Sequence, residues 1–368
     1  CCIMKWQRSS SFVTGSRNVS CSPYIHRGLE GLRQPVRAEK RRATLVGGWR
    51  QDNRYSRLAP TARLQSPRRD VNVTGNLFVD ESCIDCDTCR WMVPEVYTRV
   101  SGKSAVTTQP EDDATRLRAL QAAVACPTGS IRTEQSDPLA RSAAESFPAL
   151  VSGSQALEVE VYHLGYHSCK SYGAASYLIH DKQSGINIMV DSPRYNTKLV
   201  KAINDRFGGV NYIYLTHVDD VAEHAKLAET FGAERVIHES EASHSGLDEC
   251  EIKLKGEGPW EPWDLPSGRA KIYFQPGHSI GHTVLVYDAK VAFTGDHLAR
   301  LRTTGELGVF INYCWFSLEA QLHSLERLCE EVGDTVKLVL PGHGRPHQTD
   351  RFSAEVRIIV RDVRSSLG

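Results

Sequence analysis

The stretch YLTHVDDVAEHAKL, residues 214–227, places histidines and aspartates where a predicted strand is followed by a predicted helix. The strand-like run VNYIYLT ends at Thr216, and His217 comes directly after it. An amphipathic helix is expected next, because Val221 and several alanines recur on one side. Imidazole and carboxylate groups are ligands that divalent metal ions take in proteins, so this junction predicts a metal site.

Three other predicted strands end in short glycine-containing turns that present a histidine or an aspartate. They are KIYFQPGH, VAFTGD and VKLVLPGH, which end in His278, Asp296 and His343. An α/β sandwich gathers site residues from distant parts of the sequence at such loops. A single histidine is an ordinary residue more often than a ligand. Three separate strand ends of this kind favour one shared site.

Together these motifs resemble those of the metallo-β-lactamase-fold superfamily, an αββα sandwich, over about residues 157–350. The resemblance implies a one- or two-metal site and makes Asp191 a supporting aspartate of the fold rather than a ligand. It assigns ligand roles to five residues: His217, Asp219 and His278 for a first ion, Asp296 as the bridge, and His343 for a second ion.

The first junction departs from the family pattern T-H-x-H-x-D-H. Asp219 occupies the place of the second histidine, and an ungapped match puts Val221 and Ala222 where the family has aspartate and histidine. Exchanging a histidine for an aspartate makes the site richer in oxygen ligands. Such ligands favour iron or manganese relative to zinc without excluding zinc. We therefore expect an altered site that still binds one or two ions of iron or zinc.

Two arrangements would complete the second metal position. A two-residue insertion would bring Glu223 and His224 into the place of the missing pair. Alternatively, Asp220 and His224 would share one face of the predicted helix, because they are i and i+4. The competing interpretation of His224 is a solvated helical residue. The candidate ligands of the whole site are His217, Asp219, Asp220, His224, His278, Asp296 and His343.

A second site is predicted by the cysteines of CIDCDTC, residues 83–89, and of the downstream stretch ACPTGSI. A C-x2-C-x2-C loop wraps three corners of a cubane iron–sulfur cluster, and a distant Cys-Pro supplies the fourth. A zinc site usually pairs two C-x2-C units instead. Position 93, where a two-cluster ferredoxin has another cysteine, is Val93. We expect one 4Fe-4S cluster on Cys83, Cys86, Cys89 and Cys126.

Residues 76–133 resemble a bacterial-type, single-cluster 4Fe-4S ferredoxin over their whole length. With the later motifs, the chain is similar to plastid proteins of photosynthetic eukaryotes that join a ferredoxin to the metallo-β-lactamase fold. The expected fold class is thus an α+β ferredoxin-like cluster domain followed by an αββα sandwich at 157–368. The segment 134–156 is rich in Ser, Ala and Pro and predicts a linker.

The zero net charge of the 368-residue chain hides two opposed parts. Residues 1–70 carry a balance of +11 and the remainder −11. The basic part is rich in Arg and Ser and typical of a transit peptide, with a disordered tail or a nucleic-acid arm as alternatives. The resemblance favours the chloroplast, and the mitochondrion is the alternative. Because the chain begins with Cys1, we expect the natural N-terminus to lie further upstream.

The acidic body argues against a nucleic acid as partner, and no apolar run in the sequence is long enough to cross a bilayer. A small-molecule substrate is expected instead. Two weak hints about it are Trp260 and Trp263, which could line a pocket, and Arg194, which could meet a carboxylate.

Three functions fit the two sites. The first is metal-dependent hydrolysis of an ester- or thioester-type carbonyl, with Asp296 and Asp219 as candidate catalytic residues. The second is a non-haem iron oxidoreductase that exchanges single electrons through the cluster with an electron-transfer partner. The third is an electron carrier whose larger domain only docks.

Overall fold

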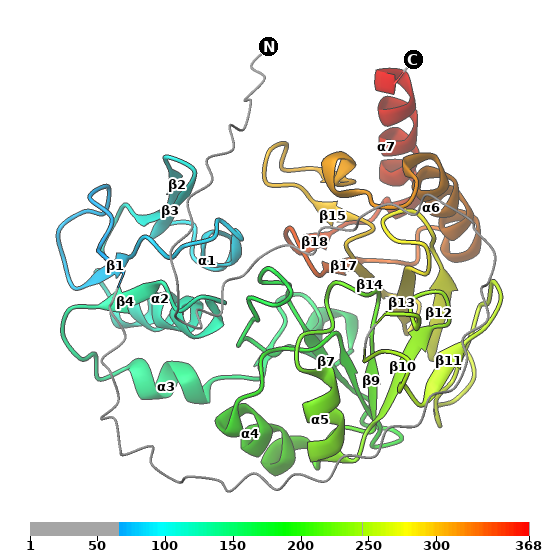
Figure 1. Cartoon of the computed structure of the whole chain (residues 1–368), viewed down its shortest axis with the longest axis horizontal. Coiled ribbons are helices and arrows are strands. Elements are labelled where there is room, and N and C mark those ends of the chain that lie inside the picture. Colours follow the sequence, from blue (N-terminus) through cyan, green and yellow to red (C-terminus); the bar gives the residue numbers. More distant parts are fainter. Residues whose placement is uncertain (1–65, 245, 368) are drawn as a thin grey trace, which may run out of the picture. The chain divides into compact units, whose positions relative to one another are not determined.

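Two antiparallel strand pairs and two helices form the first domain in the part of the chain that this computed structural model describes, residues 66–244 and 246–367. Its elements are β1 (Leu77–Val79), α1 (Thr88–Met92), β2 (Tyr97–Val100), β3 (Lys103–Val106), α2 (Asp113–Ala125) and β4 (Ile131–Thr133). Strand β1 pairs with β4 and β2 pairs with β3. This is the expected α+β cluster domain (Figure 1).

Helix α2 positions the last of the four predicted cluster cysteines. The Asp112 carboxylate caps the helix by accepting a hydrogen bond from the Thr115 amide at 2.8 Å. Ala119 on the buried side of the helix packs into the small core of the domain. The helix ends at Ala125, so Cys126 is the first residue beyond it.

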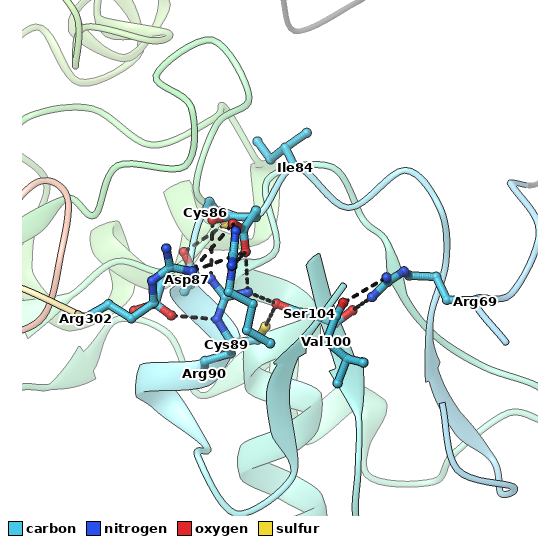
Figure 2. Close-up of polar contacts among 12 residues, drawn as sticks. Arg69, Ile84, Cys86, Asp87, Cys89, Arg90, Val100, Ser104 and Arg302 are labelled. Carbon is cyan, nitrogen blue, oxygen red and sulfur yellow. Dashed lines mark hydrogen bonds and ion pairs between the residues drawn. The ribbon is translucent and has the colours of Figure 1, made fainter. Parts of the chain in front are cut away.

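The first domain begins earlier than the sequence predicted. Residues 1–65 lie outside the described residues, so the transit peptide and the plastid location stay predictions. Residues 66–70, which the prediction included in that segment, pack on the domain instead. Arg69 is buried and donates hydrogen bonds to the carbonyls of Ser104 at 2.6 Å and Val100 at 3.0 Å (Figure 2). Its guanidinium therefore belongs to the domain and not to a solvated basic tail.

Two sheets form the second domain. The seven-stranded sheet has the order β11-β10-β9-β8-β7-β6-β5 and the five-stranded sheet the order β12-β13-β14-β17-β18. The first consists of β5 (Ala149–Leu150), β6 (Val161–His163), β7 (Tyr177–His180), β8 (Asn187–Val190), β9 (Tyr212–Tyr214), β10 (Glu234–His238) and β11 (Ile252–Leu254). The second consists of β12 (Ala270–Phe274), β13 (Thr283–Tyr287), β14 (Val291–Gly295), β17 (Leu338–Pro341) and β18 (His347–Gln348).

The buried side chains show how these layers stack. One core joins Ile188 and Tyr214 of the first sheet to Leu285 and Phe293 of the second, so the two sheets face each other. Helices α4 and α5 pack on the outer face of the first sheet, and helices α6 and α7 pack on the outer face of the second (Figure 1). Each pair of helices forms a further hydrophobic core with its sheet. The helices are α4 (Thr197–Phe207), α5 (His224–Phe231), α6 (Leu318–Val332) and α7 (Phe352–Leu367). The expected αββα metallo-β-lactamase sandwich is confirmed.

None of the helices within the described residues is both long and apolar enough to cross a membrane.

A short hairpin of β15 (Ala299–Arg300) and β16 (Leu307–Gly308) lies between β14 and α6 in the chain.

The interval 134–156 is not the structureless linker that the sequence predicted. It contains helix α3 (Ala140–Glu145), which packs between α2 and α4, and strand β5, which pairs with β6. The prediction failed because both elements are too short to show periodicity: only Ala143 of α3 is buried, and β5 has two residues. Together Ser66–Gly368 form one compact unit.

Candidate metal centre and cluster site

The four predicted cluster cysteines line one cavity in the first domain. The loop after β1 and the first turn of α1 supply Cys83, Cys86 and Cys89, and the end of α2 supplies Cys126. Burial, and then the neighbouring Cys126, raise the pKa of the Cys86 thiol to about 12, and burial raises the pKa of Cys89 well above its usual value. Four converging thiols, two of them buried and two half-buried, fit a cationic iron–sulfur core, because metal coordination deprotonates thiols that would otherwise stay neutral.

An ionic network holds the cysteine loop in shape (Figure 2). The buried Arg90 guanidinium donates to Asp87 at 2.6 Å and forms an ion pair with Asp85 at 2.8 Å. It also donates to the Ser104 hydroxyl at 2.6 Å, which accepts a hydrogen bond from the Cys89 thiol at 3.2 Å. Asp85 and Asp87 both have positive φ, of 63° and 71°, so the loop takes a backbone path that these ion pairs stabilise.

The predicted metal ligands of the second domain meet at one edge of its sheets. His217 follows β9, Asp296 follows β14 and His343 follows β17 closely. The Oδ2 atom of Asp296 lies 4.0 Å from Nε2 of His217, 3.8 Å from Nε2 of His278 and 3.9 Å from Nε2 of His343. Two ligands bound to one ion at about 2 Å each lie roughly 3–4 Å apart, so these donor atoms are spaced for metal ions.

The donor atoms form two groups that share Asp296. The first is His217, His278 and Asp296, and the second is Asp220, Asp296 and His343. Asp219 adds a carboxylate to the first group, because its Oδ2 lies 3.9 Å from His217 Nε2 and 3.8 Å from His278 Nε2. The geometry therefore suits two adjacent ions bridged by one aspartate.

Backbone and glycine geometry bring the second group together. The His343 amide donates to Oδ1 of Asp296 at 3.0 Å, which leaves Oδ2 facing the histidines. A Cβ at Gly342 would lie 2.3 Å from Oδ2 of Asp220, so this position requires glycine for the strand end to approach that carboxylate.

Several of these donor atoms are buried without a hydrogen-bond partner. They are Nε2 of His217, Nε2 of His278 and both carboxylate oxygens of Asp220. Leaving such groups unpaired costs about 1–3 kcal/mol each. Divalent cations at the two groups would satisfy them, so the residues present fit bound metal.

His224 is not brought to either group. Helix α5 begins at His224, so Asp220 lies in the preceding turn and the two residues do not share a helix face. The alternative with a two-residue insertion, which would make Glu223 and His224 ligands, is also wrong. Glu223 forms an ion pair with Lys170 at 2.6 Å instead. His224 is also no solvated residue: burial, and then the charge of Arg235, lower its pKa to about 4.

Metal binding is expected to release a proton from Asp220. Burial, and then the neighbouring Asp296 and Asp191, raise the pKa of Asp220 well above its usual value, which favours the protonated carboxyl when no metal is bound. Calorimetric titration with zinc in buffers of different ionisation enthalpy should show fewer protons released per protein by Asp220→Asn than by the wild type, by up to about one proton.

Asp219→Asn is the matched control for that titration. Burial raises the pKa of Asp219, but the neighbouring imidazoles of His278 and His217 outweigh this and lower it to about 2. Its carboxylate is already ionised and should contribute no released proton. Equal proton release by the wild-type protein and both variants would contradict the prediction.

A buried glutamate that the sequence did not single out supports the site. Glu241 accepts hydrogen bonds from the amides of Val218 at 3.2 Å and Gly281 at 2.6 Å, and so ties the His217 loop to the His278 loop. Asp191 has the supporting role that the resemblance implied, since its Oδ1 accepts from the Thr216 amide at 2.8 Å.

Replacing Glu241 by glutamine should weaken metal binding about 10- to 100-fold, because the amide nitrogen replaces one of the two acceptor oxygens and cannot accept from the loop that it faces. Competition with a chromophoric chelator measures the affinity, and thermal unfolding checks the fold. Glu239→Gln, two residues away and exposed, is the control. An unchanged affinity in Glu241→Gln would show that the two loops hold their places without it.

The two weak substrate hints are wrong. Trp263 is buried and its indole donates to the Ala270 carbonyl at 2.7 Å, while Trp260 packs edge-on to Phe274. Both therefore stabilise the fold at β12. Arg194 lies between the domains, as described next.

The second domain contacts the backbone around the cluster cysteines. Arg194 donates to the carbonyls of Cys126 at 2.8 Å and Val124 at 2.7 Å. Arg345, two residues after His343, forms an ion pair with Asp87 at 2.9 Å. The cysteine loop and the metal-binding edge of the sandwich are therefore joined by direct contacts.

Tyr172 and Gly173 complete this junction. The Tyr172 hydroxyl donates to the Ile84 carbonyl at 2.6 Å, and its ring lies 6.3 Å from the ring of His343. Gly173 has φ of 93°, and a Cβ there would lie 2.9 Å from Cβ of Cys86. Only glycine allows the second domain to approach the cysteine so closely.

Comparison with known protein families and with curated proteins gives matches over part of the chain. Residues 79–133 match the family described as the 4Fe-4S single cluster domain of Ferredoxin I. Over 129 residues, 34% of the chain, the sequence is 31% identical to a hydroxyacylglutathione hydrolase of Pelagibacter ubique (strain HTCC1062). The match covers 52% of that protein, so the chain spans about half the length of the curated relative.

Solved structures of the same fold class align at low identity. A metallo-β-lactamase superfamily protein of Sulfolobus tokodaii is 16% identical, with 56% of this chain and 86% of that chain covered and a TM-score of 0.38. A metallo-β-lactamase of Hirschia baltica is 16% identical, with 55% and 94% covered and a TM-score of 0.42.

The layer order, the matched cluster domain and the paired His/Asp groups define the class of this protein. It has the metallo-β-lactamase fold, a 4Fe-4S ferredoxin-type domain in front of it, and a buried His/Asp metal site.

Proposed function

We propose that the protein is a metal-dependent hydrolase that acts on an ester- or thioester-type carbonyl. One observation carries the proposal: a single carboxylate oxygen, Oδ2 of Asp296, lies within 4.0 Å of the Nε2 atoms of histidines from three different loops. Divalent ions at such a site supply acidity to a water molecule near neutral pH and an electrophile for a carbonyl oxygen. The name of the Pelagibacter ubique relative supports a thioester as substrate.

The residues of the chain divide the remaining work. Asp296 is fixed by the His343 amide and orients the attacking water through its other oxygen. Asp219 is the more exposed carboxylate, with a side chain 40% accessible, and its low pKa keeps it ionised. It is placed to orient the attacking water by accepting a hydrogen bond from it. The acidic body of the chain supports a small molecule rather than a nucleic acid as partner.

Hydrolysis is tested with protein loaded with zinc or ferrous iron, against the same protein after chelation. Acetyl and longer-chain acyl thioesters and esters that share one leaving group serve as substrates. We expect hydrolysis that chelation removes and added metal restores. A protein with both metal positions filled that hydrolyses none of them faster than buffer would refute the proposal.

A second candidate, a non-haem iron oxidoreductase, is favoured by the junction between the domains. Ile84 of the cysteine loop and His343 of the metal site are both in contact with Tyr172. Tyr172 therefore offers a short path for single electrons between the cysteine loop and the metal site. Anaerobic titration with dithionite, followed by electron paramagnetic resonance, tests it. Iron at the His/Asp site that stays ferric while the cluster is fully reduced would exclude this candidate.

A further inference from the structure

Three aromatic side chains partly surround the metal groups, and we name them the aromatic arc: Tyr172, Tyr313 and Trp315. They are 49%, 60% and 60% exposed. The ring of Trp315 lies 6.4 Å from that of His278, and the ring of Tyr172 lies 6.3 Å from that of His343. The arc therefore reaches both ends of the site.

The members of the arc are neighbours of one another. Tyr313 and Trp315 lie 6.2 Å apart between ring centroids, at an interplanar angle of 80°. Tyr313 also lies close enough to Tyr172 to raise its pKa, after the larger effect of burial. Two separate parts of the chain, the loop before β7 and the loop before α6, supply these rings.

Exposed aromatic rings are concentrated at this place. Among the described residues, four aromatic side chains are exposed, namely the three of the arc and Phe316. The exposed Ile311 belongs to the loop before α6, and the exposed Ile280 belongs to the His278 loop. A cluster of exposed apolar side chains in a folded protein marks a binding surface, whereas scattered ones need no explanation.

The rings are held in place although they are exposed. The Trp315 amide donates to the His278 carbonyl at 2.7 Å, and its indole donates to Oδ2 of Asp219 at 3.1 Å. Tyr172 is fixed by its hydroxyl on Ile84 and has φ of 49°, a region that a tyrosine rarely occupies. Rings fixed in advance lose little entropy when a ligand packs on them.

We propose that the aromatic arc binds a planar aromatic group on the acyl side of the substrate. This rests on the proposed hydrolase function, because the carbonyl must lie at Asp296 and Asp219 while the adjoining ring packs on Trp315 and Tyr172. Trp315 and Tyr172 pack on His278 and His343 at 6.4 and 6.3 Å, so the exposed parts of both rings lie beside the metal groups. The substrate class is thus an arylacyl or arylacetyl ester or thioester.

The test compares phenylacetyl and acetyl thioesters of one thiol, and separately the binding of phenylacetate and acetate by calorimetry. Trp315→Leu and Tyr172→Leu should each lower kcat/KM for the phenylacetyl substrate about 2- to 10-fold and weaken phenylacetate binding equally. The acetyl substrate is the reference for each variant, so the ratio of the two kcat/KM values reports the contact with the aromatic ring. Metal content must stay at the wild-type value, and Ile358→Ala, exposed on α7, is the control.

Trp315→Phe separates stacking from positioning. It keeps an aromatic face but removes the indole N–H that binds Asp219. The phenylacetyl preference should survive in Trp315→Phe and disappear in Trp315→Leu. Equal loss in both would show that Trp315 acts only by positioning Asp219, and would overturn the proposal.

The outcomes also separate this inference from the proposed function. Acetyl hydrolysis without any preference for the aromatic acyl group or for phenylacetate would refute the arc alone. Selective binding of phenylacetate without hydrolysis of any substrate would refute the hydrolase alone. A dimer that Trp315→Leu dissociates, with no aromatic preference, would assign the arc to a second copy of the chain.

Discussion

Asp296→Asn is expected to abolish activity by removing the ligand that both metal groups share. Its Oδ2 atom faces three histidines, so an amide nitrogen there would leave both ions with one anionic ligand fewer. We expect kcat/KM to fall by at least about 10³-fold, beyond the 10- to 100-fold typical of residues that only support a ligand. Elemental analysis should show loss of both ions from the second domain.

The exchange should not disturb the first domain. The iron and sulfide bound by the cysteines should be retained, because their cavity lies within residues 79–131. Asp205→Asn, an exposed aspartate of α4 paired with Lys201, is the control. Full metal content in Asp296→Asn would mean that the histidines alone hold the ions, and the bridging role would be wrong.

Cys86→Ala is expected to have the second large effect, the loss of the whole cluster. Anaerobically purified wild-type protein should be brown and contain about four iron and four sulfide in the first domain, and the variant should be colourless. Cys89 and Cys126 belong to the small core of this domain, so cluster loss should also lower its stability. Visible absorbance and thermal unfolding measure the two effects.

Cys329→Ala is the matched control for this change, because its thiol is buried in the core between α6 and the second sheet. It should keep the colour and the cluster iron. If Cys86→Ala stayed brown with a full complement of iron, the assignment of this cysteine as a ligand would be wrong.

The sequence predicted those features that local spacing determines. The C-x2-C-x2-C loop and the helix that ends just before Cys126 predicted the cluster cavity. The glycine turns predicted that His278, Asp296 and His343 belong to the metal site. These motifs can be predicted because the spacing of ligands and the ends of strands are determined by residues that are close in sequence.

The sequence did not predict features that depend on tertiary contacts. The start of α5 at His224 moved that residue away from the site, and Arg194 met carbonyls of the first domain instead of a substrate. No sequence pattern singled out Glu241 or Trp315. Glu241 matters because it is buried and bonded to two loops, and Trp315 matters because it is exposed beside the metal site. Neither burial nor exposure is fixed by neighbours in sequence.

The close approach of Gly173 to Cys86 also bears on how the protein is put together in the cell. Iron–sulfur clusters are delivered to cysteines that the delivering protein must reach. Once the sandwich has folded against the cysteine loop, Cys86 is shielded on that side by the backbone at Gly173. The cluster is therefore expected to enter before the two domains close on each other. A newly made chain that folds its second domain too early would be left colourless, with its cysteines intact but out of reach.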